Sequence, residues 1–164
     1  FGTVRAKIVP ATAIDTVAKA GAGFAGFAGF AKTVAFDCLG ENDCGLALVF
    51  ERGFVTYANQ SKTDLLHVAP EHLIKHGAVS EIIAQAMAQG LIRNTPCDLG
   101  LAITGIAGPD GGTPEKPVGL VYIAAARRSQ GALAERRDFT GTRTEIRTAA
   151  IRSALELALQ EFLA

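Results

Sequence analysis

Two side chains that can exchange protons, Tyr57 and Lys62, stand five positions apart in the sequence. The residues around them predict a strand that turns into a helix, with Ser61 as the helix cap and Asp64 three residues later. Lys62 would then be the first helical residue, and its amine would face the positive end of the helix dipole. That environment favours the neutral amine that a general base needs. The alternative interpretation is a solvated lysine within a helix cap.

A glycine-rich segment at residues 104–119, called the glycine loop below, lies between two apolar runs that predict buried strands. It reads TGIAGPDGGTPEKPVG and holds five glycines and three prolines. Glycines let backbone N–H groups approach a ligand closely, and successive N–H groups can form a nest for an anion. We interpret the loop as a cradle for a phosphate or a carboxylate, with a rigid connection of tight turns as the alternative. It lacks the G-x-x-x-x-G-K-[ST] pattern of a P-loop.

An arginine, Arg143, stands at the predicted start of the last helix, where Thr142 and Glu145 have the spacing of a capping box. A guanidinium beside free helix N–H groups can clamp an anion. Arg147 follows one helical turn later and could share that role. The alternative for both side chains is an ordinary place on the protein surface.

Metal and dinucleotide sites have weak signals in this sequence. His72 and His76 are four residues apart on a short predicted helix, which suits the edge of a metal site. The residues between them are Leu-Ile-Lys, so the acid of an H-E-x-x-H motif is missing, and His76 suits the C-terminal end of the helix dipole better. The G-x-G-x-x-G pattern at residues 21–26 has no clear strand before it. We therefore expect no metal and no cofactor.

Alternating helices and apolar strands predict an α/β layered domain that would position these residues. Four helices are predicted: one that starts at Ser61, two that span 70–76 and 80–93, and one of about five turns from Thr142. The predicted strands span 99–104, 118–126 and 132–139, and residues 46–59 hold one or two more. Charges in the strand at 132–139 place it nearer an edge of the sheet. The apolar face predicted for the helix at 80–93 consists of Ile82, Ile83, Ala86, Met87, Gly90 and Leu91. The apolar face predicted for the last helix consists of Ile151, Leu155, Ala158, Leu159 and Phe162.

Composition excludes several classes of protein. The chain has 164 residues, a length typical of one domain, and its 16 basic residues balance 16 acidic ones, which argues against nucleic acid as the main partner. No apolar run reaches the ~18 residues of a membrane span, and no secretory signal is visible. Cys38, Cys44 and Cys97 match no zinc spacing, so we expect reduced thiols in a cytoplasmic protein that does not bind membranes.

Four segments of this chain occur in an order and spacing typical of one family. They are ERGFVTYANQSK (51–62), HGAVSE (76–81), ITGIAGPDGGTPEKPVGLVYIA (103–124) and FTGTR (139–143). Together they resemble the C-terminal domain of the competence/damage-inducible protein CinA, the nicotinamide-nucleotide amidase. The resemblance covers residues 46–164, about seven tenths of the chain, whereas residues 1–45 diverge.

The resemblance implies a three-layer α/β/α sandwich with a mixed sheet, forming one domain over residues 1–164 that assembles into a homo-oligomer. It also implies hydrolysis of a small nucleotide, nicotinamide mononucleotide, to nicotinate mononucleotide and ammonia, in pyridine nucleotide salvage and NAD metabolism, without a metal or organic cofactor. The residues that it assigns to catalysis are Tyr57, Lys62 and Thr104. Those that it assigns to substrate binding are Gly105, Ala107, Gly108 and Arg143, with Lys62 as base and Arg143 as phosphate clamp.

The chain departs from the family pattern at the nucleophile. The family carries a serine within Glu-Ser-Cys-Thr-Gly-Gly, upstream of the E-R-G-F motif, but this chain has no such segment and no serine before Ser61. Cys38 is a candidate substitute nucleophile and Thr33 a weaker one. Three alternatives stay open. Another residue acts as the nucleophile, or the N-terminal region is degenerate and the protein binds a pyridine nucleotide or other phosphate ligand without turnover. The third alternative is an error of reading frame or sequence assignment. A purely structural domain is a further hypothesis.

Overall fold

The computed structural model describes residues 53–163 apart from Ser129. The helices are α2 (Asn59–Leu66), α3 (Pro70–His76), α4 (Glu81–Asn94) and α5 (Arg143–Leu163), and the strands are β1 (Leu99–Gly105), β2 (Leu120–Arg127) and β3 (Ala132–Asp138). The predictions for Thr33, Cys38 and the glycine pattern at residues 21–26 lie outside the described residues.

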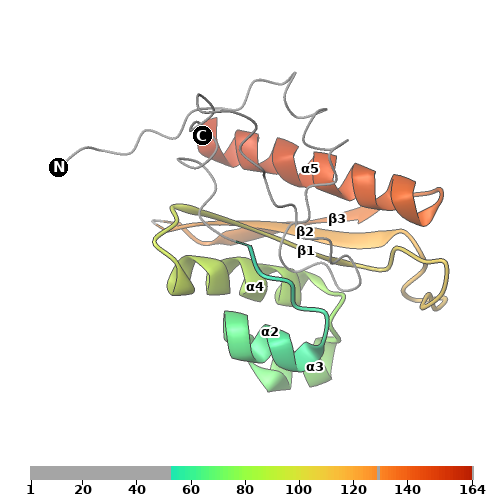
Figure 1. The fold of residues 1–164 in the computed structure, drawn as a ribbon, viewed down its shortest axis with the longest axis horizontal. Coiled ribbons are helices and arrows are strands. Elements are labelled where there is room, and N and C mark those ends of the chain that lie inside the picture. The colour runs from blue at the N-terminus through green and yellow to red at the C-terminus, as the bar shows by residue number, and fades with distance from the viewer. Residues whose placement is uncertain (1–52, 129, 164) are drawn as a thin grey trace, which may run out of the picture.

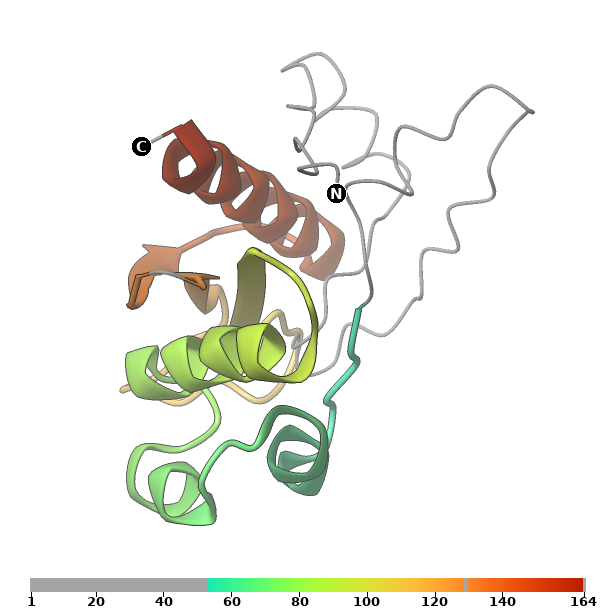
Figure 2. The same cartoon turned by 90° about the vertical axis from the view of Figure 1, so that its left-hand side faces the viewer.

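The fold is α/β and has three layers, as the resemblance implies (Figure 1). Helix α4 packs against one face of the sheet with α2 and α3 beyond it, and α5 packs against the other face (Figure 2). The strands lie in the order β1-β2-β3, and both pairings in the described part of the chain are antiparallel. Among the described strands, β3 lies at one end of this order and its last three residues are exposed, in agreement with the predicted position nearer an edge.

Both faces of β2 are buried, which explains its nearly continuous apolar sequence. Successive side chains of a strand point to opposite faces. Ala124 and Ala126 therefore meet α4, while Ile123 and Ala125 meet α5. The small alanine side chains on the α4 side leave room for the helix to approach the sheet.

Helix α4 forms as predicted, but its buried face is turned relative to the prediction. Ile82, predicted as buried, is 39% exposed. The residues that pack into the core between α4 and the sheet are Ile83, Ala84, Met87, Ala88, Leu91 and Ile92. Ser80 is the N-cap residue as predicted, yet its hydroxyl donates to the carbonyl of Gly77 at 3.0 Å and makes no cap bond to α4.

The buried face of α5 also differs from the predicted one. Ile146, Ala150, Ala154 and Leu157 pack against the sheet. Of the predicted face, Ile151 is buried, while Leu155, Ala158 and Leu159 are half-buried, and the Phe162 side chain lies outside the described residues. The prediction followed the bulkiest side chains, whereas close packing of a helix on a sheet uses alanines as well. The predicted capping box is confirmed, because the Thr142 N–H donates to Glu145 Oε2 at 2.7 Å.

The prediction for the start of α2 is wrong. The helix begins at Asn59, two residues before the predicted cap Ser61, and its N-cap is Ala58 without a side-chain hydrogen bond. Lys62 is consequently the fourth helical residue rather than the first. Residues 53–58, predicted as part of a strand, are not in a strand within the described structure, and residues 46–52 lie outside it.

Candidate active site

The side chain of Lys62 is fully buried, with 0% exposure, and its amine donates to two backbone carbonyls. The distances from Nζ are 2.8 Å to the oxygen of Thr56 and 3.4 Å to that of Tyr57. Burial lowers the pKa of the Lys62 amine, because desolvation penalises the ammonium form. A neutral amine has two N–H donors and one lone pair, so these two carbonyls match its donors and leave the lone pair available to accept a proton.

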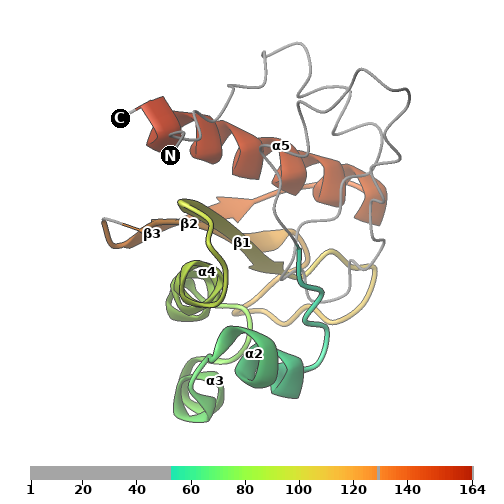
Figure 3. The same ribbon diagram turned by 60° about the vertical axis from the view of Figure 1, so that its left-hand side comes forward.

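The extended segment before α2 places those carbonyls. Residues 53–58 carry no regular hydrogen bonding among the described residues and lead directly into the first turn of α2 (Figure 3). Thr56 is fully buried, whereas Tyr57 is 70% exposed. Tyr57 therefore contributes its carbonyl oxygen to the Lys62 amine, while its ring faces solvent.

Thr104, near the end of β1, is also fully buried, and its hydroxyl donates to the carbonyl of Ala78 at 2.7 Å. Ala78 lies in the connection between α3 and α4. The Thr104 side chain thus joins the end of the sheet to this connection, which is a positioning contact that the sequence did not predict.

Lys116 was missed by the sequence analysis as a site residue. Its amine donates to the carbonyls of His76 at 2.9 Å and Val79 at 2.7 Å. With Ser80 bound to Gly77 and Thr104 bound to Ala78, the carbonyls of His76, Gly77, Ala78 and Val79 all accept a side-chain hydrogen bond. The available signal was that Lys116 is the sole lysine of a loop stiffened by prolines on both sides.

Three of the predicted binding residues have packing roles in the glycine loop. A Cβ on Gly105 would lie 2.8 Å from the Leu120 carbonyl oxygen, so close contact with β2 requires glycine there. Ala107 is buried in the core beneath α5. Gly108 has φ 75°, a left-handed conformation that glycine adopts without strain.

Several backbone N–H groups of the glycine loop are nevertheless available to a ligand. In the part of the chain that the structure describes, those of Ala107, Gly108, Gly111 and Gly112 donate to no protein acceptor. Ala107 and Gly108 are buried, and buried N–H groups are rarely left without an acceptor. The loop therefore retains the donors that an anion or oxyanion would need.

Arg143 lies against this loop, as its position at the start of α5 suggested. Its Nη1 donates to the Gly108 carbonyl at 2.5 Å, and Figure 3 shows the loop at the end of the sheet where α5 begins. Burial and the neighbouring charge of Arg143 lower the pKa of Arg147. The two positive charges thus lie close enough to interact, and that of Arg143 beside the loop would attract an anion. The Thr142 N–H is already bound by Glu145, which reduces the helix N–H groups available to that anion.

The predicted site residues fall into two hydrogen-bonded groups within the described structure. Lys62 contacts the segment before α2, whereas Thr104, the glycine loop and Arg143 form the second group at one end of the sheet. No hydrogen bond between described residues links the Lys62 amine to the loop.

The CinA C-terminal domain model matches residues 42–162, which include both of these groups. The chain belongs to the CinA C-terminal domain family.

Two relatives illustrate how this CinA domain occurs in other proteins. The nicotinamide-nucleotide amidohydrolase PncC of Escherichia coli K12 is 44% identical over 119 residues, which cover 73% of this chain and 72% of PncC. The CinA-like protein of Syntrophotalea carbinolica is 50% identical over 112 residues, which cover 68% of this chain but 27% of that protein. The chain thus spans about a quarter of the length of some curated relatives and most of the length of others.

Solved structures of the family share the fold of this CinA domain. The competence/damage inducible protein CihA of Agrobacterium tumefaciens matches with a TM-score of 0.71 and 36% identity, covering 93% of this chain and 92% of that one. The competence damage-inducible protein A of Klebsiella pneumoniae matches with a TM-score of 0.70 and 30% identity, covering 93% of both chains.

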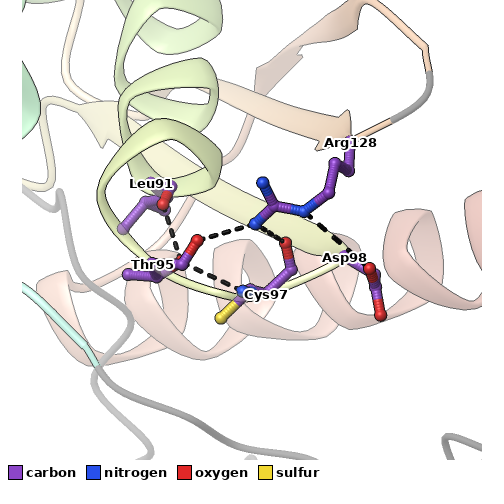
Figure 4. Close-up of polar contacts among 5 residues, drawn as sticks. All are labelled: Leu91, Thr95, Cys97, Asp98 and Arg128. Carbon is purple, nitrogen blue, oxygen red and sulfur yellow. Dashed lines mark hydrogen bonds and ion pairs between the residues drawn. The ribbon is translucent and has the colours of Figure 1, made fainter. Parts of the chain in front are cut away.

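Other polar groups of the CinA domain have local roles. The rings of His72 and His76 lie 6.2 Å apart, edge to face, and no group of three candidate metal ligands occurs among the described residues. At the end of the sheet opposite the glycine loop, Arg128 Nη2 donates to the carbonyls of Thr95 and Cys97 at 2.6 and 2.7 Å (Figure 4). This contact fixes the turn between α4 and β1. In the described part of the chain, no helix has the length and apolarity to cross a bilayer.

Proposed function

We propose that this chain is a nicotinamide-nucleotide amidase that hydrolyses nicotinamide mononucleotide to nicotinate mononucleotide and ammonia, without a metal or organic cofactor. The observation that carries the proposal is the similarity to PncC over 119 residues. The family model matches residues 42–162, which include the buried lysine, the glycine loop and Arg143. The geometry of the two groups supports the roles proposed below for Lys62, the glycine loop and Arg143.

Lys62 acts as the general base in the proposed mechanism. With both N–H groups donated to carbonyls, its lone pair accepts the proton of a nucleophile, which attacks the carboxamide carbon. The ammonium of Lys62 then gives that proton to the leaving nitrogen as the C–N bond breaks, and ammonia departs. Water, deprotonated by the same amine, attacks the acyl-enzyme. The bond to the nucleophile breaks, the ammonium returns the proton to the nucleophile, and nicotinate mononucleotide is released. The nucleophile would come from outside the described residues, where Cys38 and Thr33 are candidates.

The glycine loop and Arg143 bind the charged parts of the reacting molecule in this proposal. The free N–H groups of Ala107 and Gly108 stabilise the oxyanion that forms when the nucleophile attacks. Arg143, held against the loop by its bond to Gly108, places a positive charge beside it for the substrate phosphate. Lys116 keeps the loop in place through its bonds to His76 and Val79.

The test is ammonia release from nicotinamide mononucleotide by the purified chain and by two lysine variants. Lys62→Met removes the base, and Lys75→Met changes an exposed lysine on α3 as the matched control. We expect turnover in the wild-type chain and in Lys75→Met, and its loss in Lys62→Met. Absence of turnover in all three proteins, or full turnover in Lys62→Met, would contradict the proposal.

A second candidate function is binding of a pyridine nucleotide without hydrolysis. The absence of any serine before Ser61 favours it, because the family nucleophile is a serine. This candidate predicts that nicotinamide mononucleotide binds, as measured by calorimetric titration, while no ammonia is released. Arg143→Met should weaken binding under either function.

We also propose that the chain forms a homo-oligomer in the cytoplasm. Light scattering of the purified chain tests the assembly, and a mass equal to one chain at all concentrations would contradict it. Fractionation of the producing cells tests the location.

A further inference from the structure

A hydroxyl group without a protein partner lies next to the buried lysine. Thr56 is fully buried, and within the described residues its Oγ1 is the buried side-chain polar atom that has no hydrogen-bond partner. The carbonyl of the same residue accepts the 2.8 Å bond from Lys62 Nζ. The unpaired hydroxyl and the amine are therefore held on one stretch of backbone.

The other buried threonines of the described structure show that this hydroxyl is an exception. Thr95 Oγ1 donates to the carbonyl of Leu91 at 2.7 Å, and Thr104 Oγ1 donates to that of Ala78 at 2.7 Å. A buried hydroxyl normally finds such a partner, because it has given up its bonds to water. A buried hydroxyl without a partner lowers the stability of the fold, so its presence calls for a partner that is not part of the chain.

The backbone, rather than a side-chain bond, turns Thr56 inward. Along the extended segment, Val55 and Tyr57 are exposed, whereas Phe54 and Thr56 point to the inside. Successive side chains of an extended chain alternate in this way. Phe54 packs against the core beneath α4 and so fixes which side of the segment faces the protein.

We propose that the Thr56 hydroxyl is reserved for the amide group of the substrate and hydrogen-bonds it when the carboxamide lies beside Lys62. A hydroxyl can both donate and accept, and an amide presents both an acceptor and a donor. Shielding from water makes such a bond stronger than it would be at the surface. Because the contact forms with the bound substrate, its main effect is on affinity. This inference rests on the proposed function.

The experiment compares the wild-type chain with Thr56→Val, which removes the hydroxyl at nearly constant shape, and Thr56→Ser, which keeps it. For Thr56→Val we expect KM and the dissociation constant for nicotinamide mononucleotide to rise roughly tenfold to hundredfold, with kcat within about twofold of the wild-type value. Thr56→Ser should stay near the wild-type KM. Without ligand, Thr56→Val should unfold at the same urea concentration as the wild-type chain or a higher one, because it loses an unpaired polar group.

Three results would overturn the inference while leaving the proposed function intact. They are an unchanged KM and dissociation constant in Thr56→Val, a fall in kcat alone, and a clear loss of stability in Thr56→Val without ligand. The last would show that the hydroxyl has a partner within the protein. A wild-type chain that neither binds nor hydrolyses nicotinamide mononucleotide would instead refute the proposed function, and this inference with it.

Discussion

Burial of Lys62 makes the stability of the protein depend on pH in the alkaline range. Its pKa is lowered in the folded state from an ordinary value of 10.5, whereas the unfolded chain exposes the amine and restores that value. Between the lowered pKa and 10.5 the unfolded state binds more protons than the folded state. The free energy of unfolding should therefore rise with pH through this interval. The increase should be complete above pH 10.5 and absent below the folded-state pKa.

The size of this effect follows from proton linkage. A difference of one bound proton changes the free energy of unfolding by about 1.4 kcal/mol per pH unit, and the total gain is about 1.4 kcal/mol for each unit by which burial lowers the pKa. Lys62→Met removes this dependence. The variant also loses the bonds to the carbonyls of Thr56 and Tyr57, which subtracts an offset of about 1–2 kcal/mol at every pH.

Urea unfolding of the wild-type chain and Lys62→Met at a series of pH values from 6 to about 10.5 measures the difference directly. We expect the free energy of unfolding of the wild-type chain to increase relative to that of Lys62→Met as pH rises. Lys75→Met, which changes an exposed lysine, should follow the wild-type curve throughout. A constant difference between the wild-type chain and Lys62→Met across this range would refute the reasoning, because it would mean that the amine titrates alike in both states.

Two further predictions concern the glycine loop. Lys116→Met loses two hydrogen bonds to backbone carbonyls and should lower the free energy of unfolding by about 2 kcal/mol. The control Lys75→Met should change the free energy of unfolding little. Equal unfolding curves for the two variants would contradict this prediction. Gly119→Ala places a Cβ 1.8 Å from the Phe139 carbonyl oxygen at φ 98° and should cost more than about 2 kcal/mol. In Gly131→Ala the added Cβ meets nothing within 4 Å, so its free energy of unfolding should stay within about 0.5 kcal/mol of the wild-type value. Thermal unfolding measures both alanine variants, and similar losses of stability in the two would argue against the steric explanation.

Most helices and strands of the fold were predictable from the sequence because they depend on local patterns, whereas the three-layer arrangement came from the family resemblance. The apolar runs that form β1 and β2 and the capping box before α5 are read within a few neighbouring residues. The start of α2 was misplaced because Ser61 suits a cap, whereas the structure uses Ala58 without any side-chain bond. No side-chain cap marks that boundary, so a search for cap residues could not locate it.

The candidate site was predictable in its residue types but not in its contacts. Lys62 was singled out as a base from its expected place beside a helix start, yet burial is what lowers its pKa in the structure. The role of Lys116 depends on His76 and Val79, which lie 40 and 37 positions earlier in the chain. Thr56 carried no signal, because only the three-dimensional environment shows that its hydroxyl is buried and unpaired.

The connection between α3 and α4 has a consequence for how the family can change. His76, Gly77, Ala78 and Val79 are all recognised through their carbonyl oxygens, and every residue type has a carbonyl. Gly77 has a φ of 72°, which favours glycine, whereas the hydrogen bonds to the other three carbonyls set no requirement on the side chain of the accepting residue. The side chains that hold this segment are those of Lys116, Thr104 and Ser80. Thr104 and Lys116 belong to the glycine loop, so a loop moved into a related scaffold fits only where the backbone of residues 76–79 follows the same path.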